Sequence, residues 1–190
     1  MQKAEKKRLS VKDMVLCAMF AAFIAVGAFI RVPLGAVPMT LQFLFTNLAG
    51  LLLGRRRGAA AVLLYIFIGL IGVPIFTQGG GPGYVLQPSF GYLPGMALGA
   101  WLAGCIYERG DGSFKSALLA GLFNMAVTYT LGLLYYAAIK FFYLSGEIQL
   151  WNLLLGCCIV FLPGDGISCV LGALLAKRLW PVLKRWEGLE

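Results

Sequence analysis

One acidic residue stands inside a long apolar run near the end of the chain. Asp165 lies in the stretch FLPGDGISCVLG, directly after the helix-breaking pair Pro163 and Gly164. A carboxylate within a membrane is costly, so such a residue usually faces a cavity or a partner. We therefore predict that Asp165 contacts a ligand. The structural alternative is that its side chain caps the following helix by accepting N–H bonds from Ser168 and its neighbours.

A second candidate region is the segment of residues 72–95, GVPIFTQGGGPGYVLQPSFGYLPG. It holds seven glycines and four prolines and carries no charge, which excludes a regular helix throughout. Irregular backbone at membrane depth survives only where it is buried in protein or lines a cavity. Apolar walls with a few neutral polar groups are typical of small-molecule sites, although a structural loop that caps the bundle explains the composition equally well. The aromatic candidates are Phe76, Tyr84, Phe90 and Tyr92, and the polar ones are Thr77, Gln78, Gln87 and Ser89.

Other chemistry is largely excluded by residue type. The chain has no histidine, and its five cysteines lie in apolar segments without a C-x-x-C spacing, so we predict no metal site and no disulfide. The stretch GDGSFKS at residues 110–116 lacks the glycine before the lysine, and the preceding strand, that a phosphate-binding loop needs. The chain offers no catalytic dyad either. We predict that it is not an enzyme and has no cofactor.

The elements that position these residues must lie in a membrane. Hydrophobic residues make up 60% of the 190 positions and charged residues only 13%, and the mean hydropathy is +0.84. Soluble domains carry about a quarter charged residues. Residues 32–54 and 58–107 contain no charge at all. We expect one integral membrane domain over residues 1–190, with no cleaved signal peptide.

Charges and helix breakers divide the chain into spans. We predict an all-α integral membrane protein, a compact bundle of six transmembrane helices with the glycine-rich segment between the third and the fourth. Residues 150–162 are ambiguous: they form either a short separate helix or the first half of a kinked sixth helix. The predicted helices cover residues 11–30, 39–54, 58–72, 91–107, 114–141 and a sixth range from near 163 into the basic tail at 177–190.

Polar and small residues within these spans predict how the helices pack. Asn47 and Asn124 stand in apolar segments, where each is expected to bond a neighbouring helix rather than a ligand. The spacings GLLLG at residues 50–54 and GMALG at residues 95–99 place small residues on one helix face. Such faces allow two helix backbones to approach closely.

Basic residues predict the orientation of the bundle. Fourteen of the sixteen lysines and arginines fall on the side that holds both termini, and only Arg31 and Lys140 fall on the other. The positive-inside rule then puts both termini, including residues 1–10, in the cytoplasm and the chain in the cell membrane. The basic clusters flank spans, which indicates contact with anionic lipid of the bilayer and not with nucleic acid.

Three stretches in order resemble one family. The stretch GLIGVPIFTQGGGPGYVLQPSFGYLPG, with FLPGD after it and VPMTLQFLFTNLAGLLLG before it, is similar to the BioY family, the biotin-binding S component of energy-coupling-factor (ECF) vitamin transporters. The resemblance covers nearly the whole chain. It implies a six-helix bundle that captures biotin from outside the cell, beneath the loop between helices 1 and 2 and the glycine-rich loop between helices 3 and 4.

The resemblance also implies roles for single residues. It would place Asp165 on the ureido ring of biotin, Gln78 near the same ring, and the aromatic side chains around the bicycle and the valeryl chain. One position departs from the family, because many members carry lysine three residues after this aspartate, where the chain has Ser168. Ser168 or Gln42 would then have to replace that donor. The implied walls are Phe76, Tyr84, Phe90 and Tyr92.

The family further implies protein partners. S components dock a transmembrane coupling subunit through small residues on the first helix, and two ATPase subunits supply the energy. Ala18 and Ala22 have the required spacing, although Cys17 with Ala21 shares it and all could serve ordinary bundle packing. An S component for thiamine or riboflavin is the main alternative. A proton-coupled secondary transporter could use Asp165, but the chain shows no internal repeat and few ionisable residues in its spans.

Overall fold

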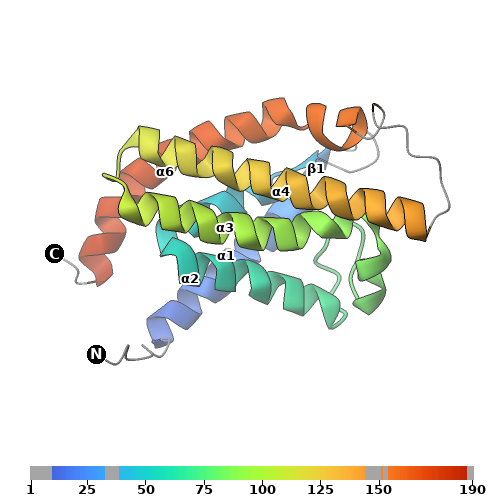
Figure 1. The fold of residues 1–190 in the computed structure, drawn as a ribbon. Helices are drawn as coiled ribbons and strands as arrows, with labels where there is room; N and C mark the ends of the chain where they lie inside the picture. The colour runs from blue at the N-terminus through green and yellow to red at the C-terminus, as the bar shows by residue number, and fades with distance from the viewer. Residues whose placement is uncertain (1–9, 33–38, 144–150, 152–153, 188–190) are drawn as a thin grey trace, which may run out of the picture.

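The computed structural model describes residues 10–32, 39–143, 151 and 154–187 (Figure 1). Long helices dominate the described residues, and they pack side by side into one bundle. Five are α-helices: α1 (Val11–Phe29), α2 (Gln42–Leu70), α3 (Tyr92–Arg109), α4 (Phe114–Phe142) and α6 (Leu162–Glu187).

The helix α2 contains two of the predicted helices joined at a sharp bend. Gly54 has a φ of 78° and a ψ of 176°, which an L side chain rarely adopts, so the helix breaks there. The chain folds back at this bend, since a Cβ built on Gly58 would lie 2.6 Å from the Ala49 carbonyl oxygen. Residues 42–53 and 55–70 therefore run as a hairpin, which confirms the predicted break between them.

Small residues let the helices approach closely at several crossings. A Cβ built at Gly50 of α2 would lie 3.1 Å from the Cα of Ala100 in α3, and one built at Gly104 would overlap the backbone nitrogen of Arg55. Gly95 of α3 faces the Thr128 backbone of α4 at 3.0 Å in the same way. The predicted small-residue faces are thus helix contacts.

A chain of polar side chains crosses the interior of the bundle. The Asn124 amide of α4 donates to Oδ1 of Asn47 in α2 at 3.3 Å, and the Thr128 hydroxyl donates to Oδ1 of Asn124 at 3.3 Å. All three residues are buried. The two asparagines bond neighbouring helices, as predicted. Nδ2 of Asn47 makes no hydrogen bond with any described residue.

One end of the bundle, which we call the Gly54 half, gathers the bend of α2 with the start of α1 and the end of α3. Arg57 binds the Asp13 carboxylate of α1 at 3.0 Å, and Arg55 lies 3.4 Å from Glu108 of α3. Ser10 caps α1, and its side chain and backbone exchange hydrogen bonds with Asp13. The end of α6 lies at this end of the bundle too (Figure 1).

The opposite end, which we call the cavity half, contains irregular backbone. Two short strands, β1 (Arg31–Val32) and β2 (Met39–Thr40), pair antiparallel between α1 and α2. They were not predicted: residue 39 was expected to begin a helix, but α2 begins at Gln42. The predicted loop between helices 1 and 2 therefore includes this strand pair, and its residues 33–38 lie outside the described residues.

The glycine-rich segment folds between α2 and α3 at this end. It contains two 3₁₀ helices, Pro82–Leu86 and Pro88–Gly91, preceded by a tight turn in which Phe76 and Gly79 exchange backbone hydrogen bonds. Gly79 and Gly81 have φ values of 116° and 101°, which explains the glycines at these turns. The guanidinium of Arg31 donates to the Thr77 carbonyl, so this segment is tied to the strand pair.

The described part of the ambiguous range 150–162 favours a kinked helix. A π-helical turn, Leu155–Ile159, leads through two residues into α6. In the described part of the chain, four helical stretches are long and apolar enough to cross a membrane: Val11–Phe29, Pro88–Arg109, Phe114–Phe142 and Leu155–Val182. The chain is therefore an all-helical, multi-pass membrane protein, with one short strand pair among the described residues.

Candidate functional site

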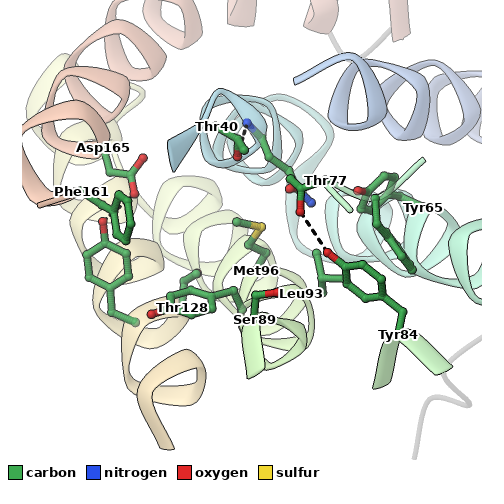
Figure 2. A pocket seen from close by; sticks show the side chains of 14 residues that line it. Thr40, Tyr65, Thr77, Tyr84, Ser89, Leu93, Met96, Thr128, Phe161 and Asp165 are labelled. Carbon is green, nitrogen blue, oxygen red and sulfur yellow. Dashed lines mark hydrogen bonds between the residues drawn. The ribbon is translucent and has the colours of Figure 1, made fainter. Parts of the chain in front are cut away.

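A cavity of about 620 Å³, including its opening to solvent, lies in the cavity half of the bundle (Figure 2). Its walls come from α2, α3, α4 and α6, from the strand β2 and from the glycine-rich segment. The lining residues are Thr40, Gln42, Tyr65, Phe76, Thr77, Tyr84, Ser89, Tyr92, Leu93, Met96, Thr128, Tyr129, Phe161 and Asp165.

Asp165 stands at one end of this cavity, which we call the Asp165 end, with Tyr92, Tyr129 and Phe161. The residue is 8% exposed, and its Oδ2 accepts a hydrogen bond of 2.5 Å from the Tyr129 hydroxyl of α4. The Tyr92 hydroxyl donates to the Cys157 carbonyl at 2.5 Å. A carboxylate can accept hydrogen bonds at both oxygens, and the bond from Tyr129 uses one of them.

The capping alternative for Asp165 is not supported. The helix α6 begins at Leu162, and the backbone N–H of Asp165 donates to the Phe161 carbonyl at 2.9 Å. Asp165 therefore lies within the first turn and not at the N-cap. Ser168 is buried, and its hydroxyl donates to the Gly164 carbonyl at 3.1 Å, one helical turn back.

The other end of the cavity, which we call the Gln42 end, consists of Thr40, Gln42, Tyr65, Thr77 and Tyr84. The Thr77 and Tyr84 hydroxyls share a hydrogen bond of 2.9 Å, and the Tyr65 hydroxyl donates to the Ile75 carbonyl at 3.1 Å. Phe76 packs between the two tyrosines, with ring centroids 5.4 Å from Tyr65 and 4.5 Å from Tyr84. Figure 2 shows this cluster across the cavity from Asp165 and Phe161.

Between these two ends the walls are mostly apolar. Met96 and Leu93 of α3 are buried there, with Ser89 of the glycine-rich segment beside them (Figure 2). The Thr128 hydroxyl also borders the cavity and belongs to the buried chain through Asn124 to Asn47. The arrangement is an apolar slot with polar groups at both ends. It suits an elongated ligand with a hydrogen-bonding group at each end.

The structure places five of the eight predicted ligand residues in the cavity wall. These are Gln42, Phe76, Tyr84, Tyr92 and Asp165.

The other three predicted residues lie outside the lining. Gln78 is exposed, and Ser168 is bonded within α6 as described above. Phe90 is half-buried behind the wall, with its ring centroid 6.5 Å from Tyr84 and 5.8 Å from Tyr135.

Tyr129 is the most informative residue that sequence reasoning missed. It lies within a long apolar helix, where a tyrosine is read as an ordinary core residue. The only sequence signal was the polar triplet Thr128–Thr130 in that span. Met96 and Leu93 carried no signal at all, because their spacing is that of any buried helix face.

The predicted docking residues lie on the outside of α1. Ala18 and Ala22 are both exposed, one helical turn apart, and so share one face of the helix. Cys17 and Ala21, which have the same spacing, are buried against the bundle. The structure thus separates a small-residue pair that packs inward from a pair that is available to a neighbour in the membrane.

Comparison with known proteins gives a consistent result over the full chain. The sequence model of the BioY family matches residues 1–185. A protein of Lysinibacillus sphaericus described as a probable biotin transporter BioY is 43% identical over 192 residues, which cover 97% of this chain and 94% of that protein. The biotin transporter BioY of Rhizobium etli is 35% identical over 183 residues, 90% of this chain and 94% of the relative.

A solved structure also resembles the fold of this chain. The crystal structure of the S component for biotin from an ECF-type ABC transporter superposes with a TM-score of 0.77 at 28% identity. The match covers 93% of this chain and 94% of that protein. Sequence and structure comparisons therefore agree on one family.

Proposed function

The chain belongs to the BioY family, and from that premise we propose that it captures biotin as the S component of an ECF transporter. The observation that carries the proposal is the buried carboxylate of Asp165 at one end of a mostly apolar slot. The ureido ring of biotin carries two N–H donors, which match a carboxylate. The bicycle and the valeryl chain are apolar and match the walls between the two ends.

In this proposal Asp165 binds the ureido N–H groups through Oδ1, while Tyr129 holds the other oxygen. Hydrogen bonds to an ionised acceptor are roughly twice as strong as bonds between neutral groups. The bond from Tyr129 also fixes the direction of the carboxylate before the ligand arrives, which lowers the entropy lost on binding. Tyr92 and Phe161 supply flat apolar faces beside it.

We assign the outer cover of the site to the glycine-rich segment and the strand pair. The contact of Arg31 with the Thr77 carbonyl supports this role, since it joins the two elements beside the cavity. Phe76, Tyr84 and Thr77 belong to both the segment and the wall. Movement of the segment would therefore open or close the Gln42 end.

We propose six membrane spans with both termini in the cytoplasm of a cell-membrane protein. The hairpin at Gly54 supports the count, because its two arms, residues 42–53 and 55–70, would add two short crossings to the four long apolar stretches. Arg55, Arg56 and Arg57 stand at the bend, in the half that holds the start of α1 and the end of α6. This distribution supports the cytoplasmic assignment of the Gly54 half. A reporter fused at Glu190 that is active only outside the membrane would refute it.

We propose that Ala18 and Ala22 form the docking face for a transmembrane coupling subunit, which acts with two ATPase subunits. Their place on an exposed face of α1, distinct from the face that buries Cys17 and Ala21, supports this assignment. Replacing both with leucine should leave biotin binding intact and abolish ATP-driven uptake in the assembled transporter, because bulky residues prevent close helix approach. Alanine-to-leucine changes at Ala126 and Ala137 of α4 provide a size-matched control. Unchanged uptake would place the docking surface elsewhere.

The substrate is tested directly by titration calorimetry of the purified protein with biotin. Thiamine and riboflavin, the ligands of the alternative function, are the comparison compounds. We expect saturable binding of biotin and none of the other two. A protein that binds either vitamin and not biotin would overturn the proposed substrate while leaving the fold and the family unaffected.

A further inference from the structure

A buried donor at the Gln42 end of the cavity has no hydrogen-bond partner among the described residues. Gln42 is 4% exposed and lines the cavity, yet its Nε2 makes no hydrogen bond with any described residue. The amide lies beside the Tyr65 hydroxyl, whose proton is directed to the Ile75 carbonyl. Native proteins rarely leave a buried donor unpaired, so the missing acceptor points to a ligand.

The two ends of the cavity differ in charge. The Asp165 end contains a carboxylate, which accepts hydrogen bonds and repels an anion. The Gln42 end contains only neutral groups among its lining residues, and the guanidinium of Arg31 binds the Thr77 carbonyl behind it. An anionic group of a ligand is therefore favoured at the Gln42 end. The two ends of the slot therefore differ in what they bind: the Asp165 end suits hydrogen-bond donors of a ligand, and the Gln42 end suits an acceptor.

We propose that the Gln42 end is the subsite for the carboxylate of the substrate and that Gln42 Nε2 donates to it. The inference rests on the proposed function, since biotin carries its carboxylate at the opposite end from the ureido ring. The hydroxyls of Thr77 and Tyr84, already bonded to each other, can supply one further donor to the same group. Gln42 is then the residue that distinguishes an acid from a neutral analogue.

The test compares ligands within each variant, so that a general change in folding cancels. Three ligands are used: biotin, biotinol, in which a CH₂OH group replaces the carboxylate, and 2-iminobiotin, in which an imino group replaces the ureido oxygen. Two variants change one side chain. Gln42→Met keeps the shape and removes the donor, and Gln42→Glu is isosteric and brings a second carboxylate to the subsite.

We expect the wild type to prefer biotin to biotinol. Gln42→Met should lower biotin affinity by roughly tenfold and biotinol affinity by less than about threefold, because only biotin loses a charge-assisted bond. Gln42→Glu should reverse the preference, since two carboxylates repel while a hydroxyl can donate to the new one. The ratio of the affinity for 2-iminobiotin to the affinity for biotin should stay within about threefold of the wild-type ratio in both variants.

Two results would overturn the inference while the proposed function stands. If both variants lost affinity for biotin and for biotinol by the same factor, Gln42 would have a structural role. If the affinity for 2-iminobiotin changed relative to biotin while the affinity for biotinol did not, Gln42 would contact the ureido oxygen instead. Gln87→Glu is the matched control, since Gln87 is exposed outside the lining, and should keep all three affinities. A wild type that binds no biotin would overturn the proposed function, and this inference with it.

Discussion

The two halves of the bundle are built from different residues. In the Gly54 half, glycine and alanine bring helix backbones together, as at Gly50 with Ala100 and at Gly104 with Arg55. Its core is a cluster of leucines and alanines. In the cavity half, tyrosines, phenylalanines and a few polar residues line a slot, although α3 and α4 still approach closely where Gly95 meets Thr128.

This difference indicates that the Gly54 half mainly stabilises the fold and the cavity half mainly recognises the ligand. Close backbone contact leaves no room for a side chain, so the Gly54 half cannot easily be altered without loss of packing. The cavity half is stabilised by directed contacts, such as the bond of Tyr129 to Asp165, that also shape a ligand site. We therefore expect substitutions in the Gly54 half to change the free energy of unfolding and substitutions in the cavity half to change affinity.

The largest effect is expected at the crossing of α2 and α3. Gly104→Ala places a methyl group against the Arg55 backbone, which cannot rotate away, and should lower the free energy of unfolding by about 3 kcal/mol, the upper part of the range for overpacking. Thermal unfolding in detergent measures it. Gly166→Ala is the control, because a Cβ there meets no atom within 4 Å, and it should be neutral or slightly stabilising. Equal effects of the two would contradict the packing argument.

The next effect concerns affinity. Asp165→Asn keeps an acceptor for Tyr129 but turns an amide N–H toward the ureido donors, so biotin affinity should fall by about tenfold to a hundredfold. The free energy of unfolding should change little, because asparagine has nearly the same shape. Calorimetry on the folded variant checks the first value and thermal unfolding the second. Wild-type affinity would remove Asp165 from the site.

The smallest expected effect on affinity tests whether Tyr129 only positions Asp165 or itself contacts the ligand. Tyr129→Phe removes the hydroxyl that holds Asp165 but leaves both carboxylate oxygens available, so biotin affinity should fall by only about threefold to tenfold. Tyr135→Phe is a matched control, since the Tyr135 hydroxyl donates to the Val85 carbonyl outside the lining, and should retain affinity. If Tyr129→Phe matched the loss in Asp165→Asn, Tyr129 would itself contact the ligand.

Much of the Gly54 half could be predicted from the sequence. Gly54 is followed by three arginines and then Gly58, a pattern that marks the end of one apolar stretch and the start of another. The helix bounds follow from charges, so α1, α3 and α4 end within two residues of the predicted positions. The strand pair between α1 and α2 could not be foreseen, because two residues per strand carry no alternating pattern.

The cavity was predictable only in part, for a geometric reason. Asp165 was identifiable because a carboxylate in an apolar run has few explanations. Gln78 was chosen from the family resemblance and Phe90 as an aromatic residue of the glycine-rich segment, but consecutive residues in tight turns and 3₁₀ helices point in different directions. Tyr129 comes from another helix, and its place beside Asp165 depends on how α4 packs against α6.

The lining of the cavity also determines how binding can be observed. It contains four tyrosines, Tyr65, Tyr84, Tyr92 and Tyr129, and no tryptophan among the described wall residues. Trp101 and Trp151 are exposed on the outside of the helices, and Trp180 packs on Tyr107 in the Gly54 half. Tryptophan fluorescence should therefore respond weakly to a ligand in the slot. Tyrosine circular dichroism in the near ultraviolet, which depends on fixed ring surroundings, is the optical signal that should report its arrival.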